Sequence, residues 1–206
     1  MYIHIKLSKN MKKNILTIGL SLVVVLSAFT LLRKEVAIDT NESSIAWVGQ
    51  KVTGEHNGTV KIKSGALMVE GANITGGNFV IDMASINVLD LEGDMKGKLM
   101  GHLKSDDFFS VEKFPTASFK ITSVSESEQE GATHYIAGDL TIKGITNKIT
   151  FPAVVSMVGS KVNAKAKFDL DRTKWNVKYG SGSFFDGLGD KMIYDDFKIE
   201  LTLSSK

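Results

Sequence analysis

Three histidines follow residue 34, and they are the first side chains to weigh for metal chemistry. His56, His102 and His134 lie far apart in the sequence, and the chain contains no cysteine. A zinc or iron site needs three or four converging ligands, which often occur at short spacings such as His-x-x-x-His. No such spacing is found here. The sequence therefore predicts no bound metal.

A glycine-rich segment, Gly180–Asp190, has the composition of a phosphate-binding loop. It lacks the Gly-Lys-Ser/Thr ending, and it precedes an expected strand, whereas a phosphate loop depends on the N-terminus of a helix. A wide hairpin loop fits the segment better. In such a loop, Phe184 and Phe185 either close over a ligand or pack beneath the loop.

Three pairs of carboxylates could in principle perform acid–base catalysis, which requires two carboxylates at a fixed separation in a cleft. Each pair is expected at a helix end, on an outward strand face or in a turn, where aspartate is favoured by capping and solvation. The Gly-x-Ser-x-Gly motif of many hydrolases is absent. We therefore predict that the protein is not an enzyme, has no catalytic residue and binds no cofactor. The pairs are Asp106/Asp107, Asp169/Asp171 and Asp195/Asp196.

The first 34 residues differ in composition from the rest of the chain. They hold six of the 25 basic residues, none of the 23 acidic ones, and an uncharged run from Ile15 to Leu32. As a helix this run would span about 27 Å, near the lower limit for crossing a bilayer. It is long for a signal peptide, and its best cleavage context, Val25–Ala28, is poor. The segment is either a cleaved signal peptide or a retained membrane anchor, and translation starts at either Met1 or Met11. Either one predicts a periplasmic or secreted domain.

Residues 35–206 are expected to form one domain. They carry 19 basic and 23 acidic residues, a formal charge of −4, without any cluster of lysine and arginine. Because nucleic-acid binding depends on a basic surface, a nucleic-acid partner is not expected.

Alternation of apolar and polar residues dominates this domain. In Lys161–Leu170 every second residue is apolar, which is the pattern of a half-buried strand. Short turns, expected at His56–Gly58, Lys63–Gly65, Glu130–Gly131 and Gly159–Ser160, predict an antiparallel meander. The other strands are expected near Ser44–Thr53, Asn57–Lys63, Ala66–Gly71, Gly77–Val88, Thr116–Ser125, His134–Lys143, Ile149–Met157 and Phe197–Leu203.

One segment, Gly93–Asp107, has helical spacing of its apolar residues and predicts a helix of about three turns across one end of the sheet. About eight strands, each with one apolar face, must form a sandwich or a closed barrel. A closed barrel of eight strands leaves room for one small ligand. The small inward residues Ala164 and Ala166 favour a hollow barrel, unless larger side chains opposite them fill the space.

The segment KLMGHLKSDDFFSVEKFPTASFK, residues 98–120, closely resembles the signature of the YceI-like polyisoprenoid-binding family. Two further segments, Gly138–Thr146 and Asp39–Gly58, are also similar to it, so the resemblance covers essentially the whole domain. Lys148 and the triplet Lys174–Asn176 depart from the usual pattern, which affects ligand identity more than fold. The ten matching positions in the first segment are His102, Leu103, Ser105, Asp107, Phe108, Val111, Phe114, Pro115, Ala117 and Phe119.

This resemblance implies an all-β fold: a lipocalin-like, extended eight-stranded antiparallel β-barrel with a short helix between strands, holding a long isoprenoid chain in its lumen. His102 is expected either to contact the head group of the ligand or to hydrogen-bond to the strand backbone. The residues expected to line the lumen are Trp47, Phe79, Ile81, Leu99, Phe119, Ile121, Leu140, Phe151, Ala164, Ala166, Phe168 and Phe197.

The expected function is non-catalytic binding of an isoprenoid-type amphiphile, such as a polyprenyl phosphate or an isoprenoid quinone, for sequestration or transport. Burial of the tail would drive binding, at about 0.8 kcal/mol per methylene. Membrane association through the N-terminal segment is a further expectation. The alternatives are an envelope structural protein with a filled barrel and an enzyme that acts on an isoprenoid lipid.

Overall fold

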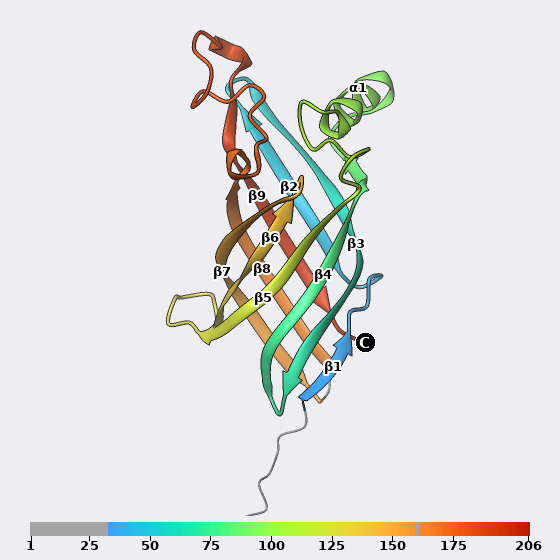
Figure 1. The fold of residues 1–206 in the computed structure, drawn as a ribbon, viewed down its shortest axis with the longest axis vertical. Coiled ribbons are helices and arrows are strands. Elements are labelled where there is room, and N and C mark those ends of the chain that lie inside the picture. Colours follow the sequence, from blue (N-terminus) through green and yellow to red (C-terminus); the bar gives the residue numbers. More distant parts are fainter. Residues whose placement is uncertain (1–32, 160) are drawn as a thin grey trace, which may run out of the picture. The chain divides into compact units, whose positions relative to one another are not determined.

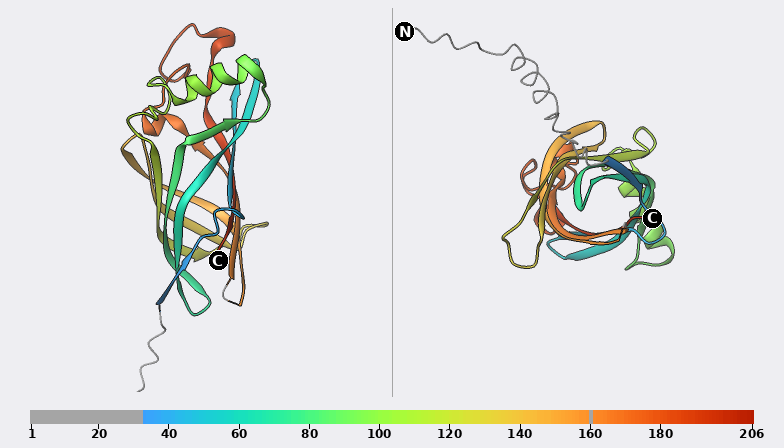
Figure 2. Two further views of the ribbon diagram at one scale, coloured as in Figure 1. Left: turned by 90° about the vertical axis from the view of Figure 1, so that its right-hand side faces the viewer. Right: turned by 90° about the horizontal axis from the view of Figure 1, so that it is seen from below.

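Eight strands form a closed antiparallel barrel in the computed structural model, which describes residues 33–159 and 161–206 (Figure 1). Each strand pairs with the next along the chain, and the last pairs with the first, so the ring seen in the right-hand view of Figure 2 is complete. The strands are β2 (Ser44–Lys51), β3 (Gly54–Glu70), β4 (Asn73–Val88), β5 (Thr116–Glu126), β6 (His134–Ile142), β7 (Ile145–Val158), β8 (Lys161–Asp171) and β9 (Ile193–Ser204).

A ninth strand, which the sequence did not predict, extends the wall at the base, where Ile38, just after it, forms a bridge with Ser205 after β9. β1 (Arg33–Ala37) pairs with the second half of β3, from Ala66 to Glu70. Nearly all of the expected signal or anchor segment, residues 1–34, lies outside the described residues. Among the residues that are described, no helix is long and apolar enough to cross a membrane.

The expected helix is confirmed as α1 (Gly93–Lys104), which connects β4 to β5 at one end of the barrel, here called the mouth (Figures 1 and 2). Leu103 is its one buried residue and joins the apolar cluster beneath the helix. The mouth also holds the β8–β9 connection, with the 3-10 turns η1 (Arg172–Trp175) and η2 (Gly189–Lys191). The opposite end, the base, is filled by buried apolar side chains such as Ile38, Leu67 and Val162.

Two of the predicted turns are wrong, because His56–Gly58 and Lys63–Gly65 lie inside the single long strand β3. The hairpin before it turns at Val52 and Thr53 instead. Gly58 serves packing: a Cβ atom there would collide with the indole of Trp47 and with the carbonyl oxygen of Asn87. Near Lys63 the chain continues as a strand because irregularities in the β3–β4 pairing absorb the local change of pattern.

Candidate functional site: the barrel lumen

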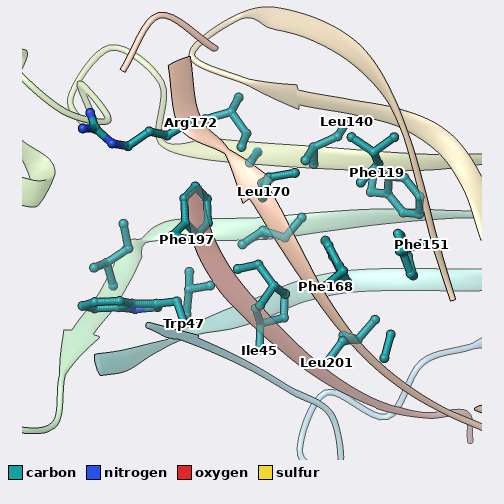
Figure 3. A pocket seen from close by; sticks show the side chains of 18 of the residues that line it. Ile45, Trp47, Phe119, Leu140, Phe151, Phe168, Leu170, Arg172, Phe197 and Leu201 are labelled. Atoms are coloured by element: carbon teal, nitrogen blue, oxygen red, sulfur yellow. The ribbon is translucent and has the colours of Figure 1, made fainter. Parts of the chain in front are cut away.

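An apolar cavity of about 290 Å³ occupies the barrel and is lined by residues from all eight barrel strands and from α1 (Figure 3). This volume is close to the lower end of the usual range for small-molecule sites. Alternate residues of each strand face it, as the two-residue period of a strand requires. The lumen is therefore hollow, and the filled barrel considered from the sequence is not what the structure shows.

All of the lumen residues predicted from the sequence line this cavity, and so does His102. Their agreement confirms the predicted strand phases, because a shift of one residue would have turned a whole strand's set outward. Their contact with a ligand stays a prediction. The lining residues in question are Trp47, Phe79, Ile81, Leu99, Phe119, Ile121, Leu140, Phe151, Ala164, Ala166, Phe168 and Phe197.

Four phenylalanines form a continuous aromatic wall along one side of the lumen. Successive ring centroids are 6.4 Å apart for Phe79 and Phe119, 5.7 Å for Phe119 and Phe151, and 4.3 Å for Phe151 and Phe168. Gly138 of β6 makes room for this wall, because a Cβ atom at that position would collide with the ring of Phe119. The ring faces offer a large apolar contact surface.

Small residues border the aromatic wall and leave the space open. Ala153 of β7 pairs with Ala166 of β8. Ala164 lies two residues before Ala166, on the same inward face of β8. All three line the cavity. The hollow interpretation of Ala164 and Ala166 is thus supported, since the side chains opposite them do not fill the lumen.

Polar lining residues are confined to the mouth. They include Gln50, Lys51 and His56 from the β2–β3 hairpin, His102 from α1, and Arg172, the first residue of η1. In the described part of the chain the lining contains no carboxylate, serine or threonine. The lumen thus combines a long apolar interior with one polar end, which is the arrangement that an amphiphile requires.

His102 is held between aromatic rings. Its centroid lies 5.2 Å from that of Phe108 and 4.5 Å from that of Tyr179, both edge-on. None of the side-chain hydrogen bonds found within residues 33–159 and 161–206 involves its ring. The expected hydrogen bond from His102 to the strand backbone is therefore not seen, and its polar atoms are available to a ligand.

His56 and Asp90 lie at hydrogen-bond and ion-pair distance, with 2.7 Å between Nδ1 of His56 and Oδ2 of Asp90. Burial would raise the pKa of Asp90, but hydrogen bonds from the Asn57 backbone N–H and from His56 outweigh it and lower the pKa. The carboxylate of Asp90 thereby stays charged and fixes His56 beside the β2–β3 hairpin. This pair stabilises the rim of the mouth.

Arg172 is the principal site residue that the sequence reasoning missed. Its side chain is 3% exposed, and its guanidinium donates to the carbonyl oxygens of Tyr194 (3.1 Å), Val177 (2.7 Å) and Ile193 (3.0 Å). Burial lowers its pKa, and Asp195 and Asp171 counteract this effect. In Figure 3 the guanidinium turns away from the lumen, so Arg172 joins β8 to the start of β9.

Other sequence expectations concern surface positions. Phe184 and Phe185 are about half exposed, at 48% and 51%, and do not line the cavity. The expected capping role is confirmed for Asp171, whose Oδ1 accepts from the Thr173 N–H at 2.9 Å. Asp106 pairs with Lys113 at the surface. Among the described residues, no group of three metal-ligating side chains converges.

Comparison with sequence families gives one match over the whole barrel: the YceI-like domain, at residues 37–205. A UPF0312 protein of Staphylococcus aureus (strain USA300) is 52% identical over 106 residues, which cover 48% of this chain and 56% of that relative. A UPF0312 protein of Photorhabdus laumondii is 36% identical over 76 residues, 37% of this chain and 35% of the relative. The matches thus span little more than half the length of these relatives, or less.

Solved structures share the fold, and two of them illustrate the likeness. BcnA of Burkholderia cenocepacia superposes with a TM-score of 0.62 at 22% identity, over 82% of this chain and 99% of that one. A polyisoprenoid binding domain from Saccharophagus degradans, implicated in plant cell wall breakdown, superposes with a TM-score of 0.58 at 12% identity. This match covers 85% of this chain and 99% of that one. At these identities the likeness shows the fold alone.

Proposed function

Because the chain belongs to the YceI-like domain family, we propose that it binds an isoprenoid-type amphiphile in its lumen without catalysing a reaction. The observation that carries this proposal is the hollow apolar barrel with polar side chains at one end only. The description of the Saccharophagus degradans neighbour as a polyisoprenoid binding domain supports it. A lining without carboxylate, serine or threonine favours binding over catalysis.

The tail of the ligand provides most of the affinity. Its methylenes and methyls contact the aromatic wall and the alanines beside it. About ten buried methylene equivalents at about 0.8 kcal/mol each give about 8 kcal/mol, which corresponds to a micromolar Kd. Ligands without a long apolar tail would therefore bind weakly.

The head group lies at the mouth, where Lys51 and His102 face the cavity. The indole Nε1 of Trp47 is buried and has no hydrogen-bond partner among the described residues, which normally costs about 1–3 kcal/mol. Arg172 already donates to three carbonyl groups, so it contributes positive potential more than direct contact. A polyprenyl phosphate and an isoprenoid quinone both fit these requirements.

We place this activity outside the cytoplasm, periplasmic or secreted, with residues 1–34 as a signal peptide or membrane anchor and residues 35–206 as the binding domain. The composition of the leader supports this assignment. Sequestration or transport of the amphiphile would then take place in the envelope.

Mass spectrometry of an organic extract of the purified protein tests the proposal without presupposing the ligand. We expect an isoprenoid lipid in the extract, in amounts approaching one molecule per chain. An extract without any such lipid, together with no binding of added isoprenoids, would contradict it. A matched extract from a Lys165→Phe variant, which adds a ring to the outer face of β8, should contain the same lipid as the unmodified protein.

A further inference from the structure

The wall of the barrel is interrupted between β7 and β8. Their ladder runs from Val158 and Lys161 only as far as Ala153 and Ala166. Beyond that point residues 145–152 of β7 pair with β6 alone, and residues 167–171 of β8 pair with β9 alone. Pro152, which has no N–H to donate, stands where the ladder ends. We call this unpaired stretch, residues 145–152 facing residues 167–171, the seam.

A pocket of about 190 Å³ occupies the seam on the outside of the barrel. Its outer lining is polar and includes Lys148, Asp169 and Lys174. Its floor consists of Ile149, Phe168 and Leu170, and the same three side chains also line the lumen. These side chains therefore lie between the outer pocket and the lumen at this place, with the buried Trp175 also lining the outer pocket.

Both ends of the seam are fixed. Towards the base the β7–β8 ladder closes it, and towards the mouth the Asn147 side chain donates to the Lys174 carbonyl oxygen at 2.8 Å. The Trp175 indole N–H also donates to the Leu140 carbonyl oxygen at 3.0 Å. The seam is thus a bounded window in the wall rather than a frayed edge. β4 and β5 also part, at the opposite end towards the base, where Ile74 lines the lumen and Val124 packs against the core.

Only side-chain contacts hold the window shut. The rings of Phe151 and Phe168 stack across it at 4.3 Å with an interplanar angle of 11°, and Figure 3 shows both rings beside the lumen. Separating two strands elsewhere would break ladder hydrogen bonds and leave their backbone groups unsatisfied. At the seam there are no ladder hydrogen bonds to break, so opening it requires only movements of side chains such as Phe168.

We propose that the seam is a lateral gate through which the tail of an isoprenoid amphiphile enters and leaves the lumen. This inference rests on the proposed function. A long tail that passes sideways through the gate exchanges one apolar contact for the next at Ile149, Phe168 and Leu170. Passage through the mouth would instead draw its whole length past Lys51, His56 and His102.

A disulfide across the seam tests the gate, and the chain has no cysteine that could compete. Thr150→Cys with Asp169→Cys places two exposed thiols at positions that would be partners if the ladder continued. The matched control is Val154→Cys with Lys165→Cys, two exposed residues on the same strands that are already partners. If the seam pair does not oxidise, a short bismaleimide joins the same two thiols.

The probe is all-trans-retinol, a fluorescent isoprenoid alcohol whose uptake is followed by energy transfer from Trp47 and Trp175. Closing the seam should slow uptake at least about tenfold, equivalent to about 1.4 kcal/mol of activation free energy. The equilibrium affinity should change by less than about twofold, because the lumen contacts are retained. The control disulfide should change neither quantity.

Two results would overturn the proposal in distinguishable ways. Equal uptake rates for the closed and the open seam pair, with retinol bound in both, would contradict the gate and leave the proposed function standing. An unmodified chain that takes up no retinol would contradict lipid binding in the lumen and the gate with it.

Discussion

Replacing Ala164 with phenylalanine tests whether the lumen is open space or core. Ala164 is partly exposed to the cavity and pairs with Val155 of β7 and Leu203 of β9. A phenyl ring at this position would occupy the place of roughly four methylenes of a bound tail. The loss is about 3 kcal/mol at about 0.8 kcal/mol for each methylene. This weakens the Kd by more than about 100-fold.

The two alternatives differ in their effect on stability. In an open lumen the ring enters empty space, so the melting temperature should stay within a degree or two of the unmodified protein, about the shift from half a kcal/mol. In a filled core, overpacking costs about 1–3 kcal/mol. At about 2–4 °C per kcal/mol for a domain of this size, the melting temperature would then fall by roughly 2–12 °C.

The assay measures the melting temperature and the lipid recovered per mole of protein on the same Ala164→Phe sample. We expect little lipid and an unchanged melting temperature. Lys165→Phe, whose ring would point outward, is the control and should change neither quantity. A destabilised Ala164→Phe protein with unchanged lipid content would refute the assignment of this space to the ligand.

Three further predictions concern other parts of the chain. Arg172→Met should destabilise the fold by about 3 kcal/mol or more, because it leaves three buried carbonyl groups without their donor and removes the guanidinium that lies 3.6 Å from Asp195. Thermal unfolding measures this, and an unchanged melting temperature would contradict the structural role of Arg172. The pKa of Asp90 is lowered from 3.8 in the fold, so its charged form stabilises the fold fully above pH 3.8. This stabilisation is lost as the pH falls below 3.8 and Asp90 becomes protonated. Asp90→Asn should therefore be less stable than the unmodified protein at neutral pH, with the difference narrowing below pH 3.8 in urea titrations. Residues 1–34 fused to a reporter active only outside the cytoplasm should export it, and an inactive fusion would remove the localisation proposal.

The lumen was predictable because one face of every strand is apolar and the side-chain period is two. A strand such as Lys161–Leu170 then admits only one orientation, which places Ala164 and Phe168 inside. Extension of the same phase by two residues points to Arg172 as the next buried position, although its guanidinium then turns away from the lumen. It was missed because the alternating pattern was followed only to Leu170, while in the structure the strand ends at Asp171 and Arg172 opens the 3-10 turn η1.

The errors in β3 have a different origin. His56–Gly58 carries a turn signal, but Gly58 is required by the indole of Trp47, a contact between two strands that local sequence does not reveal. The seam was also beyond prediction, since strand pattern does not show where a ladder stops. Pro152 was its only local sign.

The central claim is that an isoprenoid tail lies in the lumen, and photoaffinity labelling measures this most directly. A diazirine analogue of an isoprenoid alcohol, irradiated with the purified protein, should label residues of the aromatic wall such as Phe119, Phe151 and Phe168. Excess unlabelled alcohol should abolish that labelling. Labels confined to exposed side chains such as Phe184 and Phe185, undiminished by the unlabelled alcohol, would contradict the account.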